Sequence, residues 1–219
     1  MSTNHCGEEI IEAIFKALAP AVPQVVSAGF SRRLRFAMSG HDPRTGRQFI
    51  WHFFHARGGG GASQGCDGWS NVGEINVAGG IRSPSVELTE ERFPFFIEHY
   101  EFRPDSGGDG TWRGGLGATF SMIYEGDQVA LLNTAGDGVV NPPYGLCGGK
   151  PGQPHIYRLF SNGQERVLRS KEVSVRVQPG DRIFCLSAGG GGFGDPQGRP
   201  ATQRAWDVKN GYCSGASTP

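Results

Sequence analysis

Residues 30–55 read FSRRLRFAMSGHDPRTGRQFIWHFFH, and this stretch decides the fold class. Its first part alternates between arginines and apolar residues, and the apolar positions on one face are Phe30, Leu34, Phe36 and Met38. A period of two is typical of a half-buried strand. The turn-forming sequence at 41–46 then leads into a second aromatic run at 47–55. We predict that the two runs pair as an antiparallel hairpin.

The sequence on both sides of this hairpin extends the prediction to the whole chain. Residues 8–19 carry apolar side chains at helical spacing before Pro20, which predicts a short N-terminal helix. Further strands are predicted at 95–102, 117–124, 128–135, 155–160, 164–169, 173–177 and 181–187, and a C-terminal helix at 201–210. This order predicts a mainly β (α+β) fold, with antiparallel sandwich- or barrel-like sheets, long glycine-rich loops and short terminal helices.

Glycine is unusually frequent, with 36 of 219 residues, yet 37% of the residues are hydrophobic and 11% aromatic. That hydrophobic content predicts a packed core rather than disorder. The glycines cluster at 58–61, 79–80, 107–108, 114–115, 148–149 and 189–192. Residues 56–85 form too long a connection for an ordinary loop, so we interpret this segment as functional.

Charge and composition exclude several classes of protein. Lys plus Arg and Asp plus Glu are 21 each, and a net charge of zero argues against nucleic acid binding. No apolar run approaches the roughly 20 residues of a membrane-spanning helix, and the N-terminus does not resemble a signal peptide, so we expect a cytoplasmic protein. Five cysteines without a C-x-x-C pair favour neither a disulfide framework nor a zinc site.

Two short motifs fail when their context is considered. Residues 189–194 match the dinucleotide fingerprint G-x-G-x-x-G, but the following DPQGRP cannot open the helix that this motif requires. Residues 61–65 match G-x-S-x-G, but neither a strand precedes them nor a helix follows. Loop carboxylates beside flexible glycines suit metal binding or general base chemistry, although solvated turn residues are the commoner alternative.

Four segments together resemble the hydantoinase B/oxoprolinase family, in order and in spacing. They are GGGGASQGCDG (58–68), PSVELTEERFP (84–94), DSGGDGTWRGGLG (105–117) and AGGGGFGDP (188–196). A full B component is more than twice as long, so residues 1–219 resemble its C-terminal portion. Within that portion we expect a helical lead-in at 1–29, a β domain with glycine-rich loops at 30–200, and a terminal helix and tail at 201–219.

The resemblance implies a subunit of an ATP-dependent enzyme that opens a hydantoin, 5-oxoproline or lactam ring. It implies that a hydantoinase A type partner binds ATP, and that the N-terminal portion of hydantoinase B carries the H-x-P-D metal motif. Nothing in this sequence matches that motif, so we assign no metal ligand and expect no activity without the partners. Two alternatives remain, namely a noncatalytic assembly module and a subunit of a related ATP-dependent ketone carboxylase.

Under this resemblance, the candidate catalytic residues are Asp67, Glu87, Asp105 and Arg113, facing a chamber completed by other subunits. Arg113 suits bidentate binding of a carboxylate or phosphate, and exposed glycine N–H groups suit an anion. The structural alternatives are a salt bridge from Arg113 to Asp105 or Asp109, and glycines that let backbones approach across a subunit interface.

Overall fold

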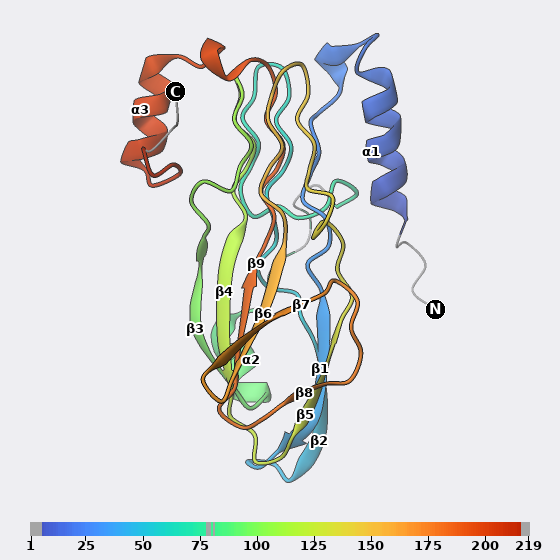
Figure 1. Ribbon diagram of the computed structural model, residues 1–219, viewed down its shortest axis with the longest axis vertical. Coiled ribbons are helices and arrows are strands. Elements are labelled where there is room, and N and C mark those ends of the chain that lie inside the picture. The colour runs from blue at the N-terminus through green and yellow to red at the C-terminus, as the bar shows by residue number, and fades with distance from the viewer. Residues whose placement is uncertain (1–5, 78–79, 81, 216–219) are drawn as a thin grey trace.

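Two antiparallel sheets and a set of extended glycine-rich segments make up the molecule (Figure 1). The computed structural model describes residues 6–77, 80 and 82–215. In chain order the elements are α1 (Gly7–Leu18), η1 (Pro23–Val25), β1 (Phe36–Asp42), β2 (Arg47–His52), α2 (Val86–Arg92), β3 (Phe95–Phe102), β4 (Ala118–Tyr124), β5 (Ala130–Thr134), β6 (Ile156–Ser161), β7 (Gln164–Leu168), β8 (Val175–Val177), β9 (Arg182–Leu186), η2 (Pro196–Gly198) and α3 (Ala201–Lys209). The predicted mainly β fold class is confirmed, with open sheets in the described part and no closed barrel.

The predicted hairpin is β1 paired with β2, with Met38 opposite Trp51. It forms the edge of a four-stranded sheet in the order β2-β1-β5-β8, and the second sheet has the order β3-β4-β9-β6-β7. All of these strand pairs are antiparallel. Of the residues expected on the core face, Leu34, Phe36 and Met38 are in the core, but the strand begins only at Phe36. Phe30 lies outside the core, and Arg33, expected on the outer face, is buried.

Aromatic side chains fill the space between the two sheets. Trp51 and Phe49 of the first sheet contact Phe95 of the second, with ring centroids 4.7 and 5.5 Å apart. Phe53 meets Phe120 edge to face at 4.9 Å. Such offset and edge-to-face pairs stabilise a core beyond the burial of area alone. They join the sheets as a sandwich.

Extended segments continue from one end of the sandwich and run side by side between α1 and α3 (Figure 1). We call this set the glycine bundle, and it consists of 28–31, 58–62, 106–110, 113–116, 144–146, 149–153 and 188–194. The segment 189–192 lies within it and donates its four N–H groups in turn to the carbonyls of Gln153, Gly115, Gly29 and Lys150. The first and the fourth of these N–H groups therefore donate to the same segment, 149–153. A period of three is the geometry of a polyproline II helix, whose backbone groups point in three directions.

Glycine is required in this bundle because backbones approach too closely for a side chain. A Cβ at Gly59 would lie 1.9 Å from the Gly115 oxygen, and one at Gly190 would lie 1.8 Å from the Gly60 oxygen. The glycines thus let backbones of the same chain approach one another closely. The assembly alternative expected such an approach between the backbones of two subunits. The idea that glycine N–H groups are free for an anion is wrong at 189–192, since those four groups bond to carbonyls.

The helices differ in how well the sequence predicted them. Both terminal helices are confirmed as α1 and α3, and they flank the bundle on opposite sides (Figure 1). The prediction missed α2, which begins after Ser85, whose hydroxyl accepts a hydrogen bond from the Leu88 N–H at 3.1 Å. A serine N-cap is the sequence signal that marks this start. Among the described residues, no helix has the length and apolarity needed to cross a membrane.

Candidate functional site

A hollow of about 270 Å³ lies beside the glycine bundle, where the chain after α1 meets the segment that follows β2. Its lining residues are Ser27, Phe30, Gly60, Gly61, Ser63, Cys66, Asp67 and Trp69. Trp69 is 72% exposed, so an indole face is open to solvent at this site. The hollow combines two aromatic rings with one carboxylate, a lining that suits a small ring with a polar edge.

A tight turn positions the carboxylate. Ser63 and Cys66 exchange two backbone hydrogen bonds of 3.1 Å, and Gly65 between them has a φ of +89°. Glycine adopts that left-handed conformation without strain. The returning chain is held because the N–H of Gly68 donates to Arg113 and the N–H of Gly60 donates to Trp69.

Asp67 is held by three hydrogen bonds. Its Oδ1 accepts from the backbone N–H of Arg113 at 2.7 Å and from Arg199 at 2.8 Å. Its Oδ2 accepts from the second guanidinium nitrogen of Arg199, also at 2.8 Å. The Asp67 side chain is still 34% exposed, so one edge of the carboxylate faces the hollow.

Asp207 of α3 completes a cluster of two carboxylates and two guanidinium groups. Arg199 Nε donates to Asp207 at 2.8 Å, and Arg113 Nε donates to it at 3.4 Å. Arg113 also lies over the Tyr212 ring, 4.9 Å from its centroid. Arg113, Arg199 and Asp207 are buried, and the cluster fastens α3 to the bundle.

The cluster fixes the protonation state of Asp67. Burial acts to raise the pKa of its carboxyl, but the hydrogen bonds from Arg199 and from the Arg113 N–H outweigh burial, and the pKa is lowered. Asp67 is therefore ionised at neutral pH and accepts hydrogen bonds. A proton acceptor in catalysis needs a pKa closer to the working pH, so this carboxylate suits binding better than general base chemistry.

The other predicted site residues lie in different settings. Glu87 is in the first turn of α2, beside the sheets, and its carboxylate accepts a hydrogen bond from Ser85, which lowers its pKa. Asp105 accepts from the N–H of Ser214 at 2.9 Å and so fastens the chain after α3. The structure thus brings Asp67 and Arg113 together and places Glu87 elsewhere. The catalytic roles of all four residues stay predictions.

The predicted salt bridge from Arg113 to Asp105 or Asp109 is wrong in its partner, because the guanidinium pairs with Asp207. Sequence reasoning also missed Arg199, Phe30 and Trp69. Only proximity in space links these residues, since Asp67 and Arg199 are 132 positions apart. The one local signal in the sequence was Trp69, an aromatic residue within a glycine-rich segment. The structure shows that its side chain is exposed.

The described residues do not fit a divalent metal. Within 6–77, 80 and 82–215 one group of three carboxylates, Glu8, Glu9 and Asp137, has oxygens within 4.8 Å of one another. Arg33 Nε lies 3.1 Å from Glu8 and already supplies a positive charge there. The glycine-rich residues 189–192 do not form a phosphate-binding site for ATP, because their N–H groups are bonded to carbonyls and are not available to phosphate oxygens.

Comparison with known proteins agrees with this architecture. The family model of hydantoinase B/oxoprolinase matches residues 1–196. The caprolactamase subunit beta of Pseudomonas jessenii is 31% identical over 94% of the chain, and the 5-oxoprolinase PfmaA of Pestalotiopsis fici is 30% identical over 87%. The crystal structure of the ATP-dependent caprolactamase from Pseudomonas jessenii superposes on 92% of the chain with a TM-score of 0.79 and 30% identity.

A nucleotide-free acetone carboxylase structure shares the fold, with a TM-score of 0.74 over 90% of the chain and 30% of its own, at 20% identity. The relatives are much longer than this chain. It spans 36% of caprolactamase subunit beta, 36% of the matched chain in the caprolactamase crystal structure and 15% of the 5-oxoprolinase. The match nevertheless covers most of the present sequence. The chain belongs to the hydantoinase B/oxoprolinase family.

Proposed function

We propose that this chain is part of an ATP-dependent hydrolase that opens a cyclic amide, such as hydantoin, 5-oxoproline or a lactam. The observation that carries the proposal is the likeness to caprolactamase subunit beta, which extends over 94% of the chain. Ring opening adds one water molecule across the amide C–N bond and yields a carboxylate, together with an amine from 5-oxoproline or a lactam and a urea group from hydantoin. The likeness to acetone carboxylase, at 20% identity, concerns the fold, so the hydrolase is preferred to the carboxylase.

The proposal includes two partners. A hydantoinase A type subunit binds ATP, and the N-terminal portion of a hydantoinase B chain supplies the rest of the active site. The glycine segment 189–192 has no free N–H groups for phosphates, which agrees with nucleotide binding elsewhere in the complex. This chain alone is expected to hydrolyse no cyclic amide.

Within the complex, the hollow beside Asp67 forms part of the substrate chamber. The ring of a cyclic amide packs on Trp69 and Phe30, because both aromatic side chains line the hollow. The ring N–H donates to Asp67 Oδ2, which accepts one hydrogen bond from Arg199 and has a further lone pair. Asp67 is thus proposed to orient the substrate rather than to move a proton.

Arg113 and Arg199 act through Asp67 as positioning residues. The guanidinium group of Arg199 and the backbone N–H of Arg113 hold its carboxylate ionised and fixed at the rim of the hollow, and the Arg113 guanidinium braces the cluster through Asp207. Preorganised acceptors of this kind raise the fraction of substrate bound in a productive orientation. For Glu87 and Asp105, a part in catalysis remains a prediction from the family resemblance.

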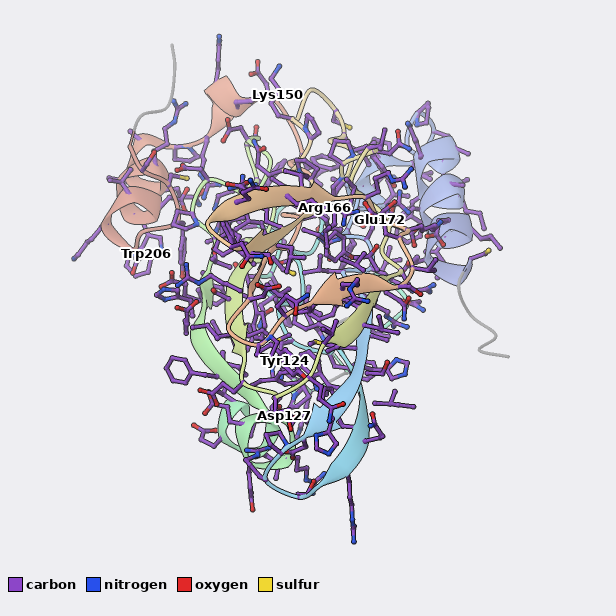
Figure 2. All side chains as sticks on the ribbon, turned by 60° about the horizontal axis from the view of Figure 1, so that its bottom comes forward. Tyr124, Asp127, Lys150, Arg166, Glu172 and Trp206 are labelled. Atoms are coloured by element: carbon purple, nitrogen blue, oxygen red, sulfur yellow. The ribbon has the colours of Figure 1, made fainter. Side chains whose placement is uncertain are left out.

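The test is reconstitution with a hydantoinase A type subunit and the N-terminal portion of a hydantoinase B chain. ATP-dependent ring opening of caprolactam, hydantoin and 5-oxoproline is measured as product and ADP formed. We expect Trp69→Ala to raise KM with little change in kcat, since it removes binding surface. The matched control is Trp206→Ala, an exposed tryptophan on α3 at the flank opposite α1 (Figure 2).

Asp67→Asn separates substrate binding from assembly. We expect it to raise KM about tenfold, while the complex still forms. The control is Asp207→Asn, which disturbs the same ion cluster without lining the hollow. A complex that works equally well without this chain overturns the proposal. A complex that requires the chain but tolerates both Trp69→Ala and Asp67→Asn supports the noncatalytic assembly module.

A further inference from the structure

The helix α1 turns its charged side toward the protein. Glu8 and Glu12 are 1% and 2% exposed, although they lie on a surface helix. Glu12 pairs with Arg32 and accepts a hydrogen bond from the Phe30 N–H at 2.8 Å, and Glu8 lies 3.1 Å from Arg33. A surface helix normally buries its apolar side and exposes its charged side. In α1 this order is reversed.

Further contacts hold α1 in this orientation. The Tyr144 hydroxyl donates to the backbone oxygen of Glu12 at 3.1 Å. Lys16 Nζ lies 5.3 Å from the centroid of the Tyr144 ring. Rolling the helix to bury its apolar side would break the contacts of Glu12 with Arg32 and the Phe30 N–H, and of Glu8 with Arg33, and would leave polar groups buried in poorer surroundings. The apolar side is therefore fixed facing outward.

Five apolar residues form that outward side, which we call the α1 stripe. Ile10, Ile14 and Leu18 are 58%, 51% and 44% exposed and follow one another at intervals of four. Ala13 and Ala17, also exposed, form a second row with the same interval. In Figure 1 this helix stands at one edge of the molecule, beside the bundle.

The two rows have the form of a helix-packing surface. Large residues at intervals of four make a ridge, and the alanines beside them make a groove into which the ridge of another helix fits. The stripe contains no charged residue, whereas transient interfaces are about as polar as ordinary surface. Its chemistry is that of a permanent interface, which resembles a hydrophobic core divided in two.

We propose that the α1 stripe packs against an aliphatic helix in the N-terminal portion of a hydantoinase B chain. This inference rests on the proposed function, because it uses the same assembly. In caprolactamase subunit beta the matched segment is 36% of the polypeptide, so the remainder is joined to it in one chain. A permanent neighbour of that size is the occupant that a wholly apolar stripe requires. A second copy of this chain is the competing occupant, and the experiment separates the two.

The experiment measures binding between this chain and a defined probe. The probe is the part of Pseudomonas jessenii caprolactamase subunit beta outside the matched segment, produced as a separate polypeptide. That subunit's own matched segment, produced separately, is the positive control. We expect the wild-type chain to bind the probe and Ile14→Glu to weaken binding at least about tenfold. Val173→Glu is the matched control, since Val173 is 80% exposed outside α1, and we expect it to leave binding unchanged.

Each outcome decides the inference. It is overturned if the positive control binds the probe and this chain does not, or if Ile14→Glu and Val173→Glu bind equally. It is also overturned if the chain alone sediments as a dimer that Ile14→Glu dissociates, because the stripe then serves a second copy. Thermal unfolding of both variants checks that they are folded. A complex that forms through α1 but opens no cyclic amide preserves this inference and overturns the proposed function.

Discussion

Neighbouring glycines in one segment of the bundle have different surroundings. A Cβ on Gly59 would lie 1.9 Å from the Gly115 oxygen, and one on Gly61 would lie 1.8 Å from the Ala28 oxygen. A Cβ on Gly60 between them would meet the side chains of Phe30 and Val72 at 3.1 Å. Side chains can yield by small rotations, but a backbone held on both sides by hydrogen bonds cannot.

Gly59→Ala and Gly61→Ala are therefore expected to be far more damaging than Gly60→Ala. The first two force backbones apart and should lower the free energy of unfolding by about 3 kcal/mol or more. For Gly60→Ala we expect the free energy of unfolding to change by less than about 1 kcal/mol. Alanine lowers the conformational entropy of the unfolded chain, and this gain offsets the cost of the tight contact in the folded state. Urea unfolding of the three variants measures the difference. Equal losses of unfolding free energy in the three variants would show that close backbone approach does not explain the need for glycine at these positions.

His155 is buried in a single tautomer. Its Nδ1 accepts a hydrogen bond from the Ala188 N–H at 2.8 Å, so its Nε2 carries the proton and donates to the Arg32 oxygen at 2.7 Å. Burial lowers the pKa of this imidazole to about 4, against an ordinary value of 6.5. Protonation of Nδ1 would break the bond from Ala188 and leave a buried charge.

The protein is accordingly expected to lose stability through His155 as the pH falls from about 6.5 to 4. In that window the unfolded state binds a proton that the folded state does not, so the free energy of unfolding decreases with falling pH, by up to about 1.4 kcal/mol per unit. Unfolding at several pH values in wild type and His155→Gln isolates this contribution. The variant should be less stable at pH 7 and show the shallower slope. Parallel slopes would contradict the assignment.

At the scale of elements, local pattern predicted the strands and missed the bundle. The bounds of β3 match the predicted 95–102, whereas the cleanest alternation in burial is in β1, because a strand that lies over a core alternates until a bulge such as the one between Ile97 and His99 shifts the register. Gly189 and its neighbours carry no such pattern, since their hydrogen bonds go to backbone carbonyls of distant segments. Glycine has no side chain whose polarity reports burial. The sequence therefore suggests loops where the molecule has extended segments packed against one another by backbone hydrogen bonds.

The helix α3 is held to the bundle by charge rather than by apolar contact. Asp207 is buried and accepts from both Arg113 and Arg199. Asp207→Asn removes one charge and leaves two buried guanidinium groups with a single carboxylate. We expect the free energy of unfolding to decrease by roughly 3 kcal/mol.

Release of α3 in Asp207→Asn should also speed cleavage by trypsin at Arg204, which lies on this helix. The control is Lys209→Gln, an exposed change in the last turn of α3, for which we expect wild-type cleavage and stability. If both variants are cleaved at the same rate, the ion cluster does not hold the helix.

At the scale of the whole molecule, the candidate site depends on contacts between segments far apart in the chain. Asp67 and Arg113 were named from sequence because they lie among glycines in segments that resemble a family. Their partners Arg199 and Asp207 were not, since nothing local indicates that Asp67 pairs with a residue 132 positions away or that Arg113 pairs with one 94 positions away. The hollow was equally hidden, because Phe30 and Trp69 meet only after the bundle forms.

The bundle and the sandwich share their chain segments, so they should unfold together. The segment 58–62 follows β2 and 188–194 follows β9, and these two strands belong to different sheets. Opening the bundle alone would expose the many backbone hydrogen bonds between its glycines, while the sandwich would lose the connections that close its end. Elements that share such a boundary form one cooperative unit.

Native-state hydrogen exchange tests this cooperativity. The amides of Gly190 and Gly191, inside the bundle, are expected to exchange with the same free energy of opening as the amide of Met122 in β4, within about 1 kcal/mol. Gly163, at the exposed tip of the β6–β7 turn, is the fast-exchanging control. Exchange of the bundle amides at a much lower free energy would mean that the bundle opens separately.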